Sequence, residues 1–250
     1  MKNINLIKDN IDNLTGFWKT VGVPSQAYKK QDAIEYCKIQ NSGWPNKLWF
    51  REDIKESDLS KIIEIVKNNP GLVIPYWDIF GSNSSHFLEQ NSFEIKTEQI
   101  GMFLKLNKKF TLQDNLTFKK VITEEDAKIW SEVYPNAFGY VIRKDILIQD
   151  YQNAHFYLVS ADKKPIGTFM LYQTEKDMGI HGVGVIPEMR RKGFAEEIMK
   201  FTINLSIDLN AETAHLQASA MGKAIYNRLG FDDLFVIRNY VLKSECMANG

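Results

Sequence analysis

The chain has 250 residues, 44% hydrophobic and 25% charged, which is enough for one or two globular domains with buried cores. Thirty-one basic residues balance thirty-one acidic ones, and a net charge of zero argues against a nucleic-acid or anionic-membrane binder. Two distant cysteines, Cys37 and Cys246, and the lack of a long apolar run predict a cytoplasmic protein without disulfides, signal peptide or membrane span.

The N-terminal part of the chain is rich in aromatic residues and ends in a polar linker. LVIPYW at residues 72–77 predicts a strand, and LNKKFTLQDN at residues 106–115 separates two domains, residues 1–112 and 113–250. Five aromatic residues either fill a core between these domains or line a cleft at their junction. They are Trp18, Trp44, Trp49, Trp77 and Phe80.

The C-terminal part begins with strands. Apolar runs at residues 156–159 and 166–171 flank the turn-like ADKKP and predict a hairpin. A third strand follows at residues 180–186, within MGIHGVGVIP. Its three glycines predict a β-bulge, or a backbone left bare for something to approach closely.

The remaining elements alternate between helix and strand. Apolar residues at spacings of four, three and four predict a helix from Phe194 to about Asn210. AHLQA at residues 214–218 predicts a strand, and residues 221–229 predict a second helix that ends at Gly230. FVIRNYVLK at residues 235–243 is the last predicted strand.

Three cations stand where the glycine-rich strand gives way to the helix at Phe194. Arg190, Arg191 and Lys192 face the electropositive end of that helix, so each adds roughly 0.3–1 kcal/mol of repulsion unless an anion is bound. Gly193 lets backbone N–H groups converge on one concavity. The arrangement therefore predicts a local pyrophosphate site.

These motifs resemble the GNAT superfamily of acetyl-CoA-dependent N-acetyltransferases. Residues 190–195, RRKGFA, match the family's pattern of Gln or Arg, two residues, Gly, one residue, then Gly or Ala. Residues 183–185 with Pro187 precede that pattern, and AIYNRLGF at residues 224–231 is similar to the family's second signature. The resemblance covers residues 113–250 and implies a mixed α/β fold of the α+β type, with a central, mostly antiparallel sheet flanked by helices.

The resemblance also implies a site for acetyl-CoA as acyl donor. The backbone of residues 183–185 would pair with the pantetheine arm, and the turn would hold the pyrophosphate. Tyr226 would act as the general acid that protonates the departing thiol. The implied cofactor-binding residues are Val183, Gly184, Val185, Arg190, Arg191, Lys192, Gly193, Phe194, Ala195 and Ser219.

The chain departs from the family pattern at the general base. Some members carry a glutamate where this chain has Gly179, and many carry an asparagine where it has Ser219. His181 lies two residues further along the same strand face, so it becomes the nearest candidate base. The four histidines, His86, His155, His181 and His215, lack ligand spacing, and no metal is predicted.

The missing carboxylate favours an acceptor that loses its proton easily. Deprotonating a lysine-like amine at pH 7 costs about 4.6 kcal/mol, and an α-amino group costs about 1.4 kcal/mol. The predicted function is acetyl transfer from acetyl-CoA to a primary amine of an unidentified acceptor. A small amine, an antibiotic, a peptide N-terminus and a protein lysine all remain open, with a small molecule or peptide as the expected partner.

The first 112 residues are predicted to be a degenerate, shortened GNAT-like half. FREDIKESDL at residues 50–59 aligns on residues 118–127, and residues 87–105 align without gaps on residues 225–243. The two offsets differ, so this alignment leaves the first copy without the hairpin, the glycine-rich strand and the phosphate turn. Such a layout is similar to bacterial tandem GNAT proteins.

Two other functions remain open. A non-catalytic acyl-CoA-binding or sensor protein is favoured by the missing carboxylate. A tandem-fold aminoacyl transferase that uses charged tRNA would share the two halves. The zero net charge and the phosphate turn count against the second alternative.

Overall fold

The computed structural model describes residues 4–243, so Cys246 lies outside the described residues. The N-terminal elements are α1 (Ile4–Gly22), β1 (Tyr28–Gln31), β2 (Ile34–Lys38), β3 (Asn46–Phe50), the 3₁₀-helix η1 (Glu56–Asp58), α2 (Leu59–Asn68), β4 (Ile74–Trp77), α3 (Ser85–Gln90) and β5 (Phe93–Lys105). The C-terminal elements are β6 (Thr117–Lys120), α4 (Glu124–Phe138), α5 (Lys144–Leu147), β7 (Ala154–Ala161), β8 (Lys164–Thr174), β9 (Asp177–Val185), the 3₁₀-helix η2 (Pro187–Met189), α6 (Phe194–Asp208), β10 (Thr213–Ala218), α7 (Lys223–Arg228) and β11 (Asp232–Leu242).

The predicted hairpin is present as β7 and β8. Both strands are longer than predicted because the connection is only Asp162 and Lys163, whose φ angles are 49° and 64°. Two consecutive positive φ angles match the two-residue turns that follow the twist of a hairpin. The helix predicted from Phe194 begins there and ends at Asp208.

The main sheet is mixed and mostly antiparallel, as predicted. It has eight strands in the order β4-β11-β5-β10-β9-β8-β7-β6, and within residues 4–243 its parallel pair is β9 with β10. β4 and β5 precede the predicted boundary at residue 112, yet both belong to this sheet. β5 even lies between β10 and β11. The boundary itself stays a prediction.

Helices cover both faces of the main sheet. On one face, Ile198 and Ile203 of α6 pack with Leu171 of β8 in one apolar cluster. On the other face, Phe17 of α1 packs with Tyr172, the next residue of β8. Neighbouring strand residues point to opposite faces, so the two clusters are separate layers.

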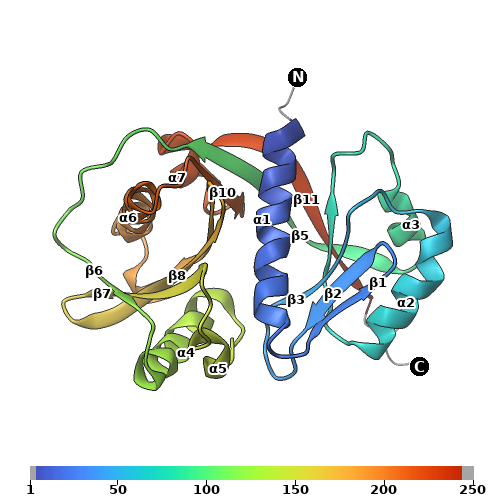
Figure 1. Cartoon of the computed structure of the whole chain (residues 1–250), viewed down its shortest axis with the longest axis horizontal. Coiled ribbons are helices and arrows are strands. Elements are labelled where there is room, and N and C mark those ends of the chain that lie inside the picture. The colour runs from blue at the N-terminus through green and yellow to red at the C-terminus, as the bar shows by residue number, and fades with distance from the viewer. Residues whose placement is uncertain (1–3, 244–250) are drawn as a thin grey trace.

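Helix α1 occupies the middle of the molecule. Figure 1 shows it between β7 and β8 with α4 and α6 on one side, and the sheet β1-β2-β3 with α2 and α3 on the other. It contacts β2, β5, β8, β9, β10 and β11. The N-terminal helix therefore covers the strands that the sequence assigns to the active site.

The aromatic residues of the N-terminal part are mostly core. The indole rings of Trp18, Trp44, Trp49 and Trp77 are buried in the cluster that includes α1 and α4. Phe80 differs, because 36% of its surface is exposed. Packing thus accounts for the four tryptophans.

Candidate active site

The parallel strands β9 and β10 separate partway along their length. Their pairing covers Asp177 to Gly179 of β9 and ends where Gly179 meets His215. Beyond that point β10 stays paired with β5, and β9 stays paired with β8. The β10-facing edge of residues 180–185 therefore has no strand partner among the described residues, and an extended ligand could pair with it.

A β-bulge interrupts β9 at the predicted glycines. Thr168 of β8 faces Gly184 and Met170 faces His181, so one residue of β8 opposes both Gly182 and Val183. Gly182 has a φ of 56°, a value that glycine adopts without strain. The predicted bulge is confirmed.

β9 has no side chain at Gly184 because residues of α4 occupy that space. A Cβ placed at Gly184 would lie 2.4 Å from the ring of Phe138 and 2.9 Å from Ala137. The glycine therefore makes room for the end of α4 on this face. The cofactor proposed from the sequence would use the free edge of β9 instead.

The turn before α6 has the geometry of an anion site. Arg191 has a φ of 63°, and Gly193, at the N-cap of α6, has a φ of 81°. Within residues 4–243, the backbone N–H groups of residues 191–195 donate to no backbone or side-chain acceptor. Unpaired amides at the start of a 15-residue helix attract an anion.

The three cations of the turn differ in their contacts. Arg190 donates from Nε to the carbonyl of Val185 at 3.1 Å and from Nη2 to the carbonyl of Ala137 at 3.4 Å. It therefore also ties the turn to β9 and α4. Arg191 and Lys192 are exposed, and Lys192 Nζ lies 3.4 Å from the sulfur of Met189.

The predicted general acid, Tyr226, lies on α7. Its half-buried ring covers Gly222, where a Cβ would lie 2.8 Å from the ring carbons, and its centroid is 6.0 Å from that of Phe231. Burial raises the pKa of Tyr226 to about 12, so the phenol keeps its proton at neutral pH. Ser219 is exposed, and its hydroxyl accepts from the amide of Gly222 at 3.3 Å.

The predicted candidate base, His181, is partly buried beneath α1. Its ring centroid lies 5.2 Å from that of Phe17, and its Nε2 is buried without a partner among the described residues. Burial lowers the pKa of His181 to about 4, so the ring is neutral at pH 7. A neutral ring has a lone pair that can accept a proton.

Several polar residues near His181 were not found from the sequence. His215 of β10 is buried, and its Nε2 lies 3.1 Å from Asp177 Oδ1. Asn13 of α1 and Gln217 of β10 also approach this region. No sequence motif indicates these residues, because the fold alone brings α1 over the two strands.

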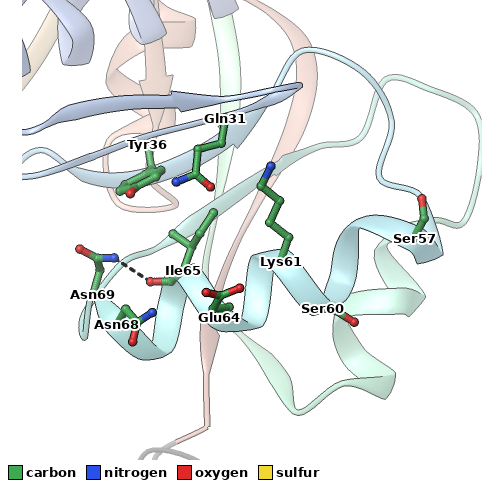
Figure 2. Close-up of a pocket in the computed structure, with 9 residues that line it drawn as sticks. All are labelled: Gln31, Tyr36, Ser57, Ser60, Lys61, Glu64, Ile65, Asn68 and Asn69. Carbon is green, nitrogen blue, oxygen red and sulfur yellow. Dashed lines mark hydrogen bonds between the residues drawn. The ribbon is translucent and has the colours of Figure 1, made fainter.

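Two surface grooves lie away from these residues. Figure 2 shows the first, of about 460 Å³, between the β1–β2 hairpin and α2, with Tyr36, Lys61 and Glu64 in its lining. The second, of about 480 Å³, is lined by residues of β5, the segment after it and α6. Neither contains a residue predicted for the active site.

The described residues contain neither a cluster of metal ligands nor a helix suited to a membrane. Within residues 4–243, no three His, Cys, Asp or Glu side chains gather closely enough to hold a metal ion. Over the same residues, no helix combines the length and the apolar character that a membrane span requires.

Comparisons with known proteins agree with this geometry. Residues 120–231 match the sequence model of the acetyltransferase (GNAT) family. A search among curated proteins finds no significant match.

Solved structures resemble most of the chain at low identity. A GCN5-related N-acetyltransferase from Kribbella flavida is 13% identical over 92% of this chain and 95% of its own, with a TM-score of 0.69. A functionally unknown conserved protein from Staphylococcus epidermidis is 15% identical over 85% and 91%, with a TM-score of 0.60. A GCN5-related N-acetyltransferase from Sphaerobacter thermophilus is 14% identical over 83% and 76%, with a TM-score of 0.59. The chain therefore has the GNAT fold and contains a segment, residues 120–231, that matches the acetyltransferase family of that fold.

Proposed function

We propose that this protein is an N-acetyltransferase that transfers the acetyl group of acetyl-CoA to a primary amine. The observation that carries the proposal is that an unpaired strand edge is followed along the chain by a turn with unpaired amides. The free edge of β9 is followed, after η2 (Pro187–Met189), by the turn at residues 191–195, whose amides lack partners among the described residues. Coenzyme A combines an extended amide-bearing arm with a pyrophosphate, so it fits both features in the right order.

We propose that residues of β9 and of the turn before α6 hold acetyl-CoA. Backbone groups of Val183 and Val185 would pair with the pantetheine arm, and the amides of residues 191–195 would bind the pyrophosphate. The exposed side chains of Arg191 and Lys192 would add positive charge. Because the arm runs from the turn back along β9, its acyl end would reach the level of His181.

Tyr226 would supply the proton for the departing thiolate. Its pKa of about 12 keeps the phenol protonated at neutral pH. The amine must be neutral to attack, which favours an α-amino group of a small molecule or peptide over a lysine side chain. Cys37 is a free, buried thiol, which suits the reducing cytoplasm that we propose as the location.

The experiment that tests this function combines binding and turnover. Calorimetry on the purified protein is expected to detect binding of acetyl-CoA. A panel of amines should then be screened by following thiol release from acetyl-CoA. Absence of heat at millimolar coenzyme A would refute the proposal.

A non-catalytic acyl-CoA-binding or sensor protein is the second candidate. It is favoured by the bare Gly179 and by the low pKa of His181, which makes the isolated ring a weak base. Both candidates require acetyl-CoA binding, and only the enzyme requires turnover. A protein that binds acetyl-CoA but releases no thiol with any amine of the panel would be the sensor.

We also propose that the chain consists of two GNAT-like halves, residues 1–112 and 113–250. The support is a repeated order of elements: β1, β2, β3, α2, β4, α3 and β5, then β7, β8, β9, α6, β10, α7 and β11. This order agrees with the alignment of residues 87–105 on 225–243. It differs from the alignment of residues 50–59 on 118–127, because β3 and α2 correspond to β9 and α6. The first half thus has short counterparts of the elements that the sequence alignment left out.

A further inference from the structure

The proposed reaction needs a group that takes the proton from the amine. The neighbours of His181 include Phe17 and Asn13 of α1, and Gln217 of β10. Phe17 packs against the ring, and the other two bring polar side chains to it. The orientation of these two amides decides what His181 can do.

Asn13 has a fixed orientation. Its Nδ2 donates to Thr174 Oγ1 at 2.9 Å and to the carbonyls of Tyr172 at 3.1 Å and Asp177 at 3.4 Å. Its oxygen is therefore the atom left over. Asn13 is 1% exposed, and Oδ1 has no hydrogen-bond partner among residues 4–243. A buried acceptor of this kind is costly unless a donor reaches it.

The unpaired oxygen of Asn13 lies beside His181. A Cβ placed at Gly179 would be 2.0 Å from Asn13 Oδ1 and 2.4 Å from His181 Nε2. Both atoms are buried and unpaired, and both converge on the bare Cα of one glycine. Any side chain at Gly179 would collide with both, so glycine is required where some similar proteins carry a glutamate.

Gln217 presents a second oxygen to the same ring. Its Nε2 donates to Asn10 Oδ1 at 2.9 Å, and Asn10 is itself fixed by donating to the carbonyl of Met102 at 2.9 Å. Gln217 raises the pKa of His181 against the effect of burial, and we infer that its remaining oxygen is the atom that acts on the ring. A neutral imidazole has one N–H and can serve only one of two oxygens, whereas an imidazolium serves both.

We propose that Asn13 and Gln217 are positioning residues that make His181 the proton acceptor, because their two oxygens hydrogen bond both ring nitrogens once the ring is protonated. This inference rests on the proposed function. The amine nitrogen forms its bond to the acetyl carbon, and a water molecule carries its proton to the unprotonated nitrogen of His181, because Nε2 is buried. The carbon–sulfur bond breaks, and the sulfur takes the proton of Tyr226.

The charged surroundings of His181 come from β9, β10 and α1, whose Asp9 interacts with Asp177 and His215. His215 of β10 lowers the pKa of His181, and His215 is itself held by Asp177. Asn13, Phe17 and Gln217 carry no charge. A carboxylate introduced at residue 13 or 217 would therefore be a new charge next to the ring. It would change the proton affinity of His181.

The test follows the ring protons of His181 by NMR as the pH is varied, with His181→Gln to assign the signal. Asn13→Asp is expected to raise the proton affinity of His181 at least tenfold. Because this variant also loses the donors of Asn13, Gln217→Glu at the half-buried Gln217 provides a second route to the same shift. Asn46→Asp is the matched control, since Asn46 also has a buried, unpaired oxygen but lies in β3.

Turnover is measured separately, by thiol release from acetyl-CoA with alaninamide as the probe amine. Asn13→Leu is expected to lower kcat about 10- to 100-fold with an unchanged KM for acetyl-CoA. The inference is overturned if both carboxylate variants leave the proton affinity of His181 within about twofold of the wild type. If these variants raise it but no amine is acetylated, the proposed function fails while the hydrogen-bond arrangement stands.

Discussion

In the two proposed halves, the helices that follow the third strand begin in opposite electrostatic surroundings. α6 begins behind a basic turn whose amides lack partners among the described residues. α2 begins behind an acidic segment, in which Asp58 accepts from the amide of Lys55 at 3.0 Å and Asp53 accepts from the amide of Ile54 at 2.9 Å. Side-chain carboxylates of the chain thus occupy amides in the first half, whereas the second half leaves its amides for an external anion.

The two proposed halves also differ at the position of the predicted general acid, Tyr226. The alignment of residues 87–105 on 225–243 places Leu88 opposite Tyr226, and Leu88 is fully buried. β3 is also only five residues long and carries no glycine, whereas β9 has nine residues and a bulge. One half therefore has a packing residue where the other has a hydroxyl, and cofactor binding is expected in the second half alone.

The largest expected effect comes from Tyr226→Phe. Removing the phenol proton should lower kcat for thiol release by about 10²- to 10³-fold, because the thiolate then departs without a general acid. Binding of acetyl-CoA, measured by calorimetry, should remain unchanged.

The matched control for Tyr226 lies in the first half. Tyr76 of β4 is buried and its hydroxyl lies 2.9 Å from Ser84 Oγ. Tyr76→Phe is expected to leave kcat within about twofold of the wild type. Equal losses in both variants would remove the catalytic distinction between the halves.

His181 makes the stability of the second half dependent on pH. Its pKa of about 4 in the folded protein is below the ordinary 6.5, so the unfolded chain binds more protons between these values. Stability is therefore complete above about pH 6.5 and decreases as the pH falls toward 4, by on the order of 2–3 kcal/mol. His181→Gln should flatten this dependence in urea unfolding.

The control for His181 is His86→Gln in α3 of the first half. Its curve of unfolding free energy against pH should run parallel to that of the wild type. If the His181→Gln and wild-type curves also run parallel, His181 is not held neutral by burial.

Features that depend on neighbouring residues in the sequence could be predicted, and features that depend on contacts between distant residues could not. The hairpin, the bulge at Gly182 and the helix start at Phe194 were predicted, because turn chemistry and apolar spacing are local. The order of strands and helices after residue 153 was predicted from apolar runs and spacing, and the resemblance to the GNAT fold from two short motifs. These elements specify their own conformation.

The surroundings of His181 could not be predicted, because they come from distant parts of the chain. Asn13 is more than 160 residues from His181 in sequence and reaches it only because α1 crosses the sheet. The insertion of β5 between β10 and β11 is also invisible in the sequence, since β5 reads as an ordinary strand. Arg190 was predicted to face an anion, and its contacts with Val185 and Ala137 depend on where α4 ends.

Gly184 distinguishes β9 from β3 by its contact with α4. Gly184→Ala should lower the free energy of unfolding by about 2 kcal/mol, because the new methyl group collides with the ring of Phe138. Phe138→Leu combined with Gly184→Ala should recover part of this loss in a double-mutant cycle measured by urea unfolding. If the losses of unfolding free energy in the two single variants simply add in the double variant, the ring of Phe138 is not the reason for glycine at residue 184.

The smallest expected effect is at Arg191, where the comparison between the two helix starts can be measured directly. Arg191→Glu places a carboxylate beside the unpaired amides and should weaken acetyl-CoA binding about tenfold, which corresponds to roughly 1.4 kcal/mol. The loss should shrink as salt is added, because Arg191 is exposed and its field is screened. Lys55→Glu makes the same charge reversal before α2, where Asp53 and Asp58 already accept from backbone amides. If calorimetry finds that Lys55→Glu weakens acetyl-CoA binding as much as Arg191→Glu, net charge determines affinity and the turn before α6 has no special role.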